Sequence, residues 1–352
     1  DSVSFGWSRL EYNEAQSSFA VALDRSGGSD FFIPAGYSEP INIAKQNNIS
    51  MQLNLFASNE TKIKNPSGVG QVGLIEGLLA DPEAQSEVIS QIVRALNNTP
   101  VENDVISFDG IVVDFENLRG ERLKELYNGF LSTLSSELKK NSKKLYVAVH
   151  PERAAGQAYY DGYDYRAIRE IADKVILMAH DYNAVSLTEN EMDIGYNDTP
   201  LTPINEVYYA LKAITDKDTG VADLSKVWLQ LSFDTAQWKM ADGKVINRNA
   251  FRPSYEQLRD RIIKNESGSD LSLKYSERLQ NPWLTYHNSS DGTDNIIWYE
   301  DTRSINAKIE LAKLFGINGI SLWRLGIIPD FEEVGGNENY LDIWQAIKEQ
   351  RK

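Results

Sequence analysis

The sequence predicts an α/β fold, specifically an eight-stranded (β/α) TIM barrel with a small insertion late in the barrel. Short apolar segments of strand length alternate with segments whose apolar residues recur at helical spacing. This alternation stops between about 239 and 301 and then resumes. Because repeated strand and helix units build parallel sheets, and eight such units close a barrel, we expect residues 1–352 to form one barrel with one insertion.

The expected strands share Val, Ile, Leu and aromatic residues. In order they are 2–7, 19–23, 50–56, 106–116, 144–151, 174–181, 227–233 and 319–326, with a short hairpin strand at 31–33 and an insertion hairpin of 283–286 against 296–299. The expected helices are 39–46, 82–96, 121–141, 165–172, 204–214, 254–264, 302–315 and 339–352. Asp81 and Pro82 mark the clearest helix start, because Asp caps a helix and Pro fits its first turn.

Composition excludes several classes of protein. The 352 residues are 41% hydrophobic and 25% charged, which is ordinary for a globular protein with a large core. The net charge of −15, with no long basic run, argues against nucleic-acid binding. The chain has no cysteine, so it can hold neither disulfides nor thiolate metal sites. It also has no apolar run near the roughly 20 residues that span a bilayer.

The segment 106–116 carries the main candidate site. Its nearly continuous apolar run ends in Asp114 and Glu116, and strand alternation places Val112, Asp114 and Glu116 on one side. Two aligned acids at the end of a buried strand repel each other, which should raise the pKa of one and so make a general acid. The alternative is that both acids only favour the start of the following helix.

The stretch Asp109-Gly-Ile-Val-Val-Asp-Phe-Glu116 resembles the Asp-x-x-Asp-x-Asp-x-Glu signature of glycoside hydrolase family 18, the chitinases and their relatives. Its ending looks most like the bacterial branch that includes spore-cortex-lytic and peptidoglycan N-acetylglucosaminidases. The resemblance implies a retaining mechanism in which the substrate's own acetamido group attacks the anomeric carbon. Glu116 would then act as general acid and later as base, and Asp114 would orient the acetamido N–H.

Val112 is a departure from this signature, because the family has an Asp at that position. The missing acid would share a proton with the next Asp, so the two would titrate together. Without it, we expect Asp114 to stay turned toward Glu116 and the pH profile to be simpler. Asp109 has the opposite strand parity and is expected to be structural.

Two later segments add candidate substrate-binding residues. Met178-Ala-His-Asp181 resembles the family's Met-x-Tyr-Asp, so Asp181 matches and His180 replaces a tyrosine that would bind the acetamido carbonyl. His180 can donate a hydrogen bond itself, Tyr182 could substitute for it, or His180 could be a core residue. Trp323 matches the tryptophan that would lie under the N-acetyl sugar, with plain core packing as the alternative. For a group of further aromatics, outer sugar subsites compete with simple hairpin packing: Trp238, Trp283, Trp298 and Tyr299.

We therefore expect a glycoside hydrolase acting on a β-linked N-acetylglucosamine polysaccharide, with bacterial peptidoglycan favoured over chitin. An enzyme for protein-linked glycans and a silent, lectin-like glycan-binding protein are the alternatives. We expect no cofactor and no catalytic metal. The chain opens with Asp1-Ser-Val-Ser and no leader, so either the protein is cytoplasmic or this is a processed or trimmed form. We favour the second interpretation and expect an extracellular, wall- or spore-associated protein. The oligomeric state cannot be predicted from the sequence.

Overall fold

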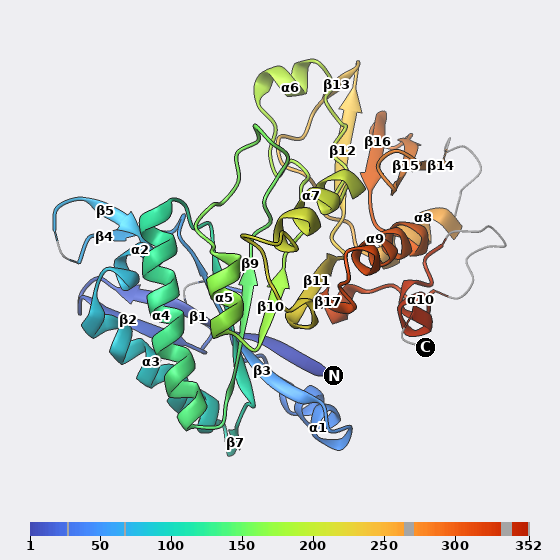
Figure 1. Cartoon of the computed structure of the whole chain (residues 1–352). Coiled ribbons are helices and arrows are strands. Elements are labelled where there is room, and N and C mark those ends of the chain that lie inside the picture. The colour runs from blue at the N-terminus through green and yellow to red at the C-terminus, as the bar shows by residue number, and fades with distance from the viewer. Residues whose placement is uncertain (27, 67, 264–270, 332–339, 351–352) are drawn as a thin grey trace. The chain divides into compact units, whose positions relative to one another are not determined.

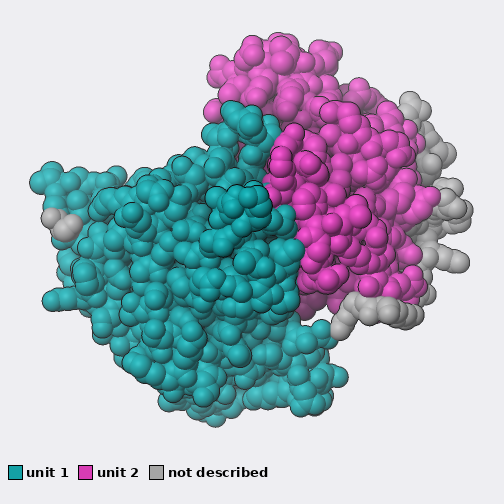
Figure 2. All heavy atoms as spheres, viewed as in Figure 1, with its two compact units in different colours: residues 1–178, 213–228 teal, residues 179–212, 229–352 magenta. Residues whose placement is uncertain are grey.

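The computed structural model describes residues 1–26, 28–66, 68–263, 271–331 and 340–350. The chain divides into two compact units, coloured separately in Figure 2. Unit 1 comprises residues 1–178 and 213–228, and unit 2 comprises residues 179–212 and 229–352. Within the described residues, no helix combines the length and the apolar content that crossing a bilayer requires.

Unit 1 is built on a sheet with the strand order β10-β9-β8-β3-β1-β2 (Figure 1). The strands β1, β3, β8, β9 and β10 pair in parallel along this order. Their bounds are β1 Ser2–Asn13, β2 Ser18–Ala22, β3 Ser50–Ser58, β8 Gly110–Glu116, β9 Lys144–Val149 and β10 Lys174–Leu177. The parallel order is the one that successive β/α units produce.

The helices of unit 1 follow the predicted alternation closely. They are α1 Ser38–Gln46, α2 Leu74–Leu79, α3 Pro82–Asn97, α4 Glu121–Lys140 and α5 Tyr165–Ile171, with a 3-10 turn η1 at Leu224–Lys226. The Asp81 carboxylate accepts hydrogen bonds from the amides of Glu83 and Ala84 at 3.0 and 3.1 Å, which confirms the predicted cap. Helix α2 was not predicted, nor were two small hairpins, β4 Lys62–Lys64 with β5 Gln71–Gly73 and β6 Thr99–Val101 with β7 Asp104–Ile106.

The second predicted strand is not a barrel strand. It is β2, which pairs antiparallel with β1, and β1 itself continues to Asn13 instead of ending at residue 7. The predicted strand at 31–33 is also wrong. That segment is irregular, with Phe31 stacked on Phe56 at 4.2 Å between ring centroids and its carbonyl accepting from Arg9 at 2.8 Å.

The strand that bears the acids begins later than predicted. Residues up to Ile106 belong to the β6–β7 hairpin, and β8 begins at Gly110. A Cβ at Gly110 would lie 2.4 Å from the Gln52 amide oxygen and 2.4 Å from the Lys144 carbonyl, so only glycine fits between β3 and β9. Asp109, just before it, accepts hydrogen bonds from the Met51 amide at 2.8 Å and the Ser50 hydroxyl at 3.3 Å, which is the expected structural role.

Unit 2 contains an antiparallel sheet where the insertion was expected. Its strand order is β13-β12-β16-β15-β14, with bounds β12 Ala236–Ala241, β13 Lys244–Val245, β14 Ser272–Ser276, β15 Asn281–Asn288 and β16 Thr293–Trp298. The pairing of Trp283 with Trp298 and of Thr285 with Ile296 confirms the predicted hairpin. Trp238, Trp298 and Ile296 belong to a buried cluster with Leu187, Leu201, Ala236 and Val245, which forms the core beneath this sheet.

The remaining elements of unit 2 complete the alternation. They are α6 Glu189–Asp193, α8 Tyr255–Ile263, α9 Thr302–Leu314, β17 Gly319–Trp323, the 3-10 turn η2 Leu325–Ile327 and α10 Ile343–Gln350. Helix α7 (Ile204–Ile214) and strand β11 (Val227–Ser232) each run across a unit boundary along the chain. The predicted helix ends at 264, 339 and 351–352 lie outside the described residues.

A buried ion pair joins α9 to the end of the antiparallel sheet. The Lys308 ammonium donates to the Glu300 carboxylate at 2.7 Å, and both side chains are 1% exposed. Glu300 also accepts from the Asn281 amide at 2.9 Å and from the Ser304 hydroxyl. Burial raises the pKa of Glu300, and the Lys308 charge and these hydrogen bonds offset that rise only in part.

Candidate active site

Strand β8 presents Asp114 and Glu116 at its carboxyl end in unit 1. The ring of Phe115 lies against helix α4, with centroids 6.0 Å from Tyr127 and 5.8 Å from Phe130. Since side chains alternate along a strand, Asp114 and Glu116 point to the opposite face of the sheet. The parallel neighbours β3 and β9 hold β8 on both sides, which fixes where this face lies.

Asp114 sits between a polar neighbour and an apolar layer. Its side chain is largely buried, and the Asn54 amide donates to its carboxylate at 3.3 Å. One step earlier on the same face, Val112 is 3% exposed and packs in an apolar cluster with Ala148, Ile176 and Met178. The position where the family signature has a further acid is therefore part of the apolar interior of unit 1.

Two buried tyrosines lie behind the acids. Burial raises the pKa of Tyr127 well above its usual value, and the negative charge of Asp114 adds to the rise. Burial does the same for Tyr163, with further contributions from Tyr127, Glu116 and Asp114. The Tyr163 hydroxyl donates to the Phe115 carbonyl at 2.8 Å. Both phenols therefore remain protonated near neutral pH and can act only as neutral hydrogen-bonding groups.

Glu116 ends β8 at the rim of the sheet and is half-buried. Its carbonyl accepts from the Asn59 amide at 3.0 Å, and the next side chain, Asn117, donates to the Ser58 hydroxyl at 2.8 Å. These contacts tie the ends of β3 and β8 together at the carboxyl side, which is where parallel α/β sheets carry their chemistry.

A second carboxyl, Glu152, follows the neighbouring strand β9. Burial raises its pKa, and the charge of Lys124 opposes the rise. Just before it, His150 packs on Tyr160 with 4.7 Å between ring centroids, and the Tyr160 hydroxyl donates to Glu60 at 2.9 Å. The carboxyl ends of β3, β8 and β9 thus bring acidic and aromatic side chains to one edge of unit 1.

The later candidates, His180 and Asp181, lie in unit 2 and contact each other. His180 Nδ1 lies 2.9 Å from the Asp181 carboxylate, and its Nε2 lies 2.8 Å from the side-chain oxygen of Gln230 on β11. The Gln230 amide in turn donates to the Ser321 hydroxyl on β17 at 3.2 Å. Asp181 and Gln230 therefore hold the imidazole at its two ring nitrogens, and Ser321 on β17 holds Gln230 in turn.

The charges around Asp181 act in opposite directions. Burial would raise its pKa, but the charge and hydrogen bond of His180, the Ser232 hydroxyl and the Arg252 guanidinium outweigh burial, so the pKa lies below its usual value. Asp234 behaves differently: burial and the charge of Asp181 raise its pKa, against the pull of Arg252, with which it forms an ion pair. This group is thus a network of hydrogen bonds and ion pairs and not an isolated acid.

Replacing Asp181 by asparagine should therefore remove stability in a pH-dependent way. Folding lowers the pKa of this carboxyl, so its ionised form stabilises the folded state. The stabilisation is complete above the unfolded pKa of about 3.9 and is lost as the pH falls through the folded pKa. We expect urea unfolding to show Asp181→Asn less stable than wild type at pH 6, with the difference shrinking below about pH 4. Asp193→Asn, an exposed acid of unit 2, is the control. A difference that is constant with pH would contradict the expectation.

The aromatic candidates divide into two groups. Trp323 ends β17, is half-buried, and its carbonyl accepts from the Phe233 amide at 2.9 Å, so it occupies the predicted strand end. The Tyr182 amide donates to the Leu201 carbonyl at 2.8 Å. The proposed outer-subsite residues are mostly core: Trp238, Trp298 and Tyr299 are 0%, 4% and 2% exposed, and Trp283 packs on Trp298. Hairpin packing, the alternative, is therefore correct for the three buried residues.

The predicted site residues fall in both units, with Asp114 and Glu116 in unit 1 and the other four in unit 2. Their convergence in one site stays a prediction. Sequence reasoning missed Asn54 and Gln230, although each is a polar residue inside an apolar strand, which is a usable signal. It also missed Arg252, which has no local signal. Among the described residues, no group of three or more His, Asp or Glu side chains is arranged to hold a metal ion.

Comparison with known families gives the class of the protein. Residues 68–327 match the family described as Glycosyl hydrolases family 18, so the chain belongs to this family. The predicted resemblance to this family is therefore confirmed. The matched range includes Asp114, Glu116, His180, Asp181 and Trp323.

Two of the relatives by sequence are named cortical fragment-lytic enzymes. The chain is 26% identical over 276 residues to the cortical fragment-lytic enzyme of Bacillus subtilis, covering 76% of this chain and 56% of that protein. It is 24% identical over 292 residues to the corresponding enzyme of Bacillus anthracis, covering 82% and 61%. The chain thus spans less than two thirds of the length of these relatives.

Solved structures share the fold. The spore cortex-lytic enzyme SleL of Bacillus megaterium aligns with a TM-score of 0.62 and 22% identity, covering 88% of this chain and 61% of that one. A chitinase of Chromobacterium violaceum aligns with a TM-score of 0.66 and 18% identity, covering 99% and 91%. The predicted α/β class is confirmed, and the closed eight-stranded barrel stays a prediction.

Proposed function

We propose that this protein is a retaining, substrate-assisted glycosidase that cleaves β-linked N-acetylglucosamine polymers, with bacterial cell-wall or spore-cortex peptidoglycan as the favoured substrate. The single observation that carries the proposal is the pair Asp114 and Glu116 on one face at the carboxyl end of buried β8, inside the range that matches family 18. Relatives named cortical fragment-lytic enzymes favour the wall polymer over chitin. Action outside the cell, or on the spore, is part of the same proposal.

The division of labour between the two acids follows from their surroundings. Glu116 is half-buried at the rim, where it can reach a glycosidic oxygen and later a water molecule. Asp114 is buried beside the Asn54 amide, so it is better suited to hold a substrate N–H than to exchange protons with solvent. The acetamido carbonyl of the substrate then forms the bond to the anomeric carbon that a second enzyme carboxylate supplies in other glycosidases.

Four residues of unit 2 are assigned roles in the same reaction. We assign His180 and Tyr182 to the acetamido carbonyl, Asp181 to the polar network that fixes His180, and Trp323 to the apolar face of the sugar. The His180 ring is held by Asp181 and Gln230, so it would present a fixed hydrogen-bonding edge.

Product analysis tests this function. The protein is incubated with purified peptidoglycan, spore-cortex fragments and chitooligosaccharides, and the products are identified by mass spectrometry after reduction of their new ends. N-acetylglucosamine at the new reducing end is the expected result, with retained β configuration in NMR spectra recorded during the reaction and before any reduction. Muramic acid at the new reducing end would overturn the proposed cleavage after N-acetylglucosamine, and inverted configuration would overturn the retaining mechanism. Binding of these glycans without cleavage would instead establish the lectin-like alternative.

A further inference from the structure

The antiparallel sheet of unit 2 carries a cationic pocket of about 400 Å³. Strands β12 and β15, the segment before α8 and helix α8 itself line it, with the residues Gln237, Lys239, Phe251, Arg252, Pro253, Gln257, Arg261, Tyr286 and Asn288. Arg252 connects this pocket to the candidate site, because it pairs with Asp234 and its charge acts on Asp181. A glycan held near Asp181 in unit 2 would therefore have this pocket beside it.

Three cations and no acid line the pocket, in a chain whose net charge is −15. Lys239 pairs with Asp291 at 2.8 Å, and Arg252 pairs with Asp234. Arg261 has no carboxylate partner among the described residues, and its buried Nη1 has no hydrogen-bond acceptor there. Arg261 therefore adds to the pocket a positive charge that no carboxylate of the described residues neutralises.

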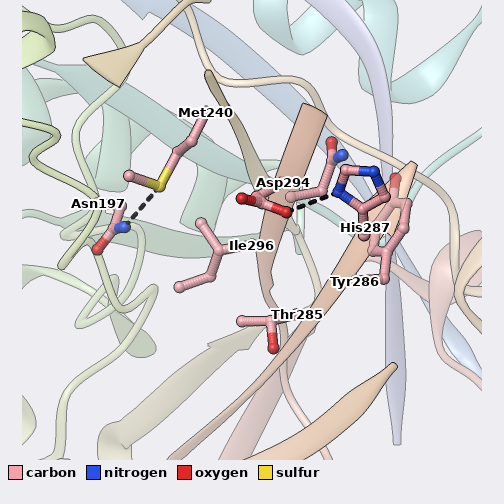
Figure 3. Close-up of a pocket in the computed structure, with 8 residues that line it drawn as sticks. Asn197, Met240, Thr285, Tyr286, His287, Asp294 and Ile296 are labelled. Carbon is pink, nitrogen blue, oxygen red and sulfur yellow. Dashed lines mark hydrogen bonds and ion pairs between the residues drawn. The ribbon is translucent and has the colours of Figure 1, made fainter. Parts of the chain in front are cut away.

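A second pocket on the same sheet lacks these cations. A neighbouring pocket of about 290 Å³ on the same sheet, shown in Figure 3, shares the side chain of Tyr286. It also contains His287 and Asp294, which face each other with the His287 Nδ1 2.9 Å from the Asp294 carboxylate. No Lys or Arg is among the residues that line it. The two pockets therefore differ in charge while lying on the same strands.

We propose that the cationic pocket binds a carboxylate of the glycan, so that the enzyme's substrate class is an acidic amino-sugar polymer and not neutral chitin. This proposal rests on the function proposed above and narrows it. A guanidinium binds a carboxylate through two parallel hydrogen bonds, and Arg261 lies with its central carbon 5.1 Å from the Tyr286 ring centroid, which fixes the fork. Phe251, half exposed at the pocket, offers an apolar plane to a sugar face.

Carboxylates of two kinds occur on wall glycans, the lactyl group of muramic acid and the acids of its peptide. Both offer the same chemistry to Arg261. Chitin carries neither group. The binding of glycans that differ only in these groups therefore isolates the proposed contact.

The test measures affinity and not turnover. Dissociation constants are determined by calorimetry, in a Glu116→Gln background that keeps the glycans intact, for peptide-bearing strands, peptide-free strands, carboxyl-amidated strands and chitooligosaccharides. We expect Arg261→Gln to lower the affinity for acidic strands about tenfold relative to the neutral ones, and Arg261→Lys to recover most of this preference. A loss on peptide-free strands assigns the lactyl carboxylate, whereas a loss confined to peptide-bearing strands assigns the peptide.

Two control variants accompany the test. Arg259→Gln removes a cation from the same helix that stacks on Phe331 outside the pocket, and His287→Gln alters the neighbouring pocket. Neither should change the acidic-to-neutral ratio, and thermal melting checks the fold of each variant. An unchanged ratio in Arg261→Gln, or an equal loss on all four glycans, would overturn the proposal. If the wild type bound glycans in a carboxylate-dependent way but hydrolysed none of them, the proposed function would be refuted. The carboxylate-binding role of the pocket would still hold.

Discussion

Replacing Glu116 by glutamine is expected to lower the rate of glycan hydrolysis by about a thousandfold, within the range that a positioned general acid contributes. Glutamine has nearly the same shape, but its amide cannot deliver a proton to the leaving oxygen or take one from water. The backbone contacts at the end of β8 do not involve the carboxyl group, so the fold should persist. Mass-spectrometric release of fragments, compared at equal glycan binding, measures the effect.

The matched control is Glu152→Gln. Glu152 is the other half-buried acid at this edge of unit 1, and burial raises its pKa as a general acid would require. It follows β9 outside the family signature, so we expect its replacement to cost far less than that of Glu116. A large loss in Glu152→Gln together with an active Glu116→Gln would move the general acid from β8 to β9.

Replacing Lys308 by methionine is expected to lower the free energy of unfolding by about 3–5 kcal/mol. The ammonium is buried and binds Glu300 at 2.7 Å, so its removal leaves a buried carboxylate that only Asn281 and Ser304 contact. Methionine fills nearly the same volume, so lost packing contributes little. The cost is therefore electrostatic, which gives it a defined dependence on pH.

The sign of that dependence follows from the raised pKa of Glu300. Without Lys308 the folded pKa rises further above the unfolded value of about 4.3, so the loss is small below about pH 4 and grows toward pH 7. Urea unfolding at both pH values measures it. Lys313→Met, an exposed lysine on the same helix, should cost at most about 1 kcal/mol. Equal losses for Lys308→Met at pH 4 and pH 7 would show that packing and not charge is responsible.

The sequence was most informative where local rules decide the structure. Asp81 and Pro82 begin α3 as predicted, because capping involves only neighbouring residues. The apolar run before Asp114 correctly gave a buried parallel strand, and the spacing of apolar residues in 121–141 gave α4. The order of these elements, together with the family signature, was enough to predict the α/β class.

The errors arose where contacts distant in sequence override the local pattern. The strand predicted at 2–7 ends too early, because the polar residues 11–14 indicate a loop, whereas β1 continues through Arg9 to Asn13. In the structure this arginine is buried, with Glu11 at 2.6 Å and the Asp24 carbonyl at 2.7 Å satisfying its charge and donors. The partners of His180 were missed for a similar reason, since Gln230 lies 50 residues away and no spacing rule connects the two.

The anchoring of the main chain around Glu116 limits how this acid can move. The Phe115 carbonyl accepts from the Tyr163 hydroxyl, the Glu116 carbonyl accepts from the Asn59 amide, and the Phe115 ring is wedged against α4. With the backbone tied on both sides, the carboxyl group can change its orientation only by rotation about its own side-chain bonds. Glu116 would then donate a proton to the departing sugar in one side-chain rotamer and accept a proton from water in another. No loop movement would be needed between the two half-reactions.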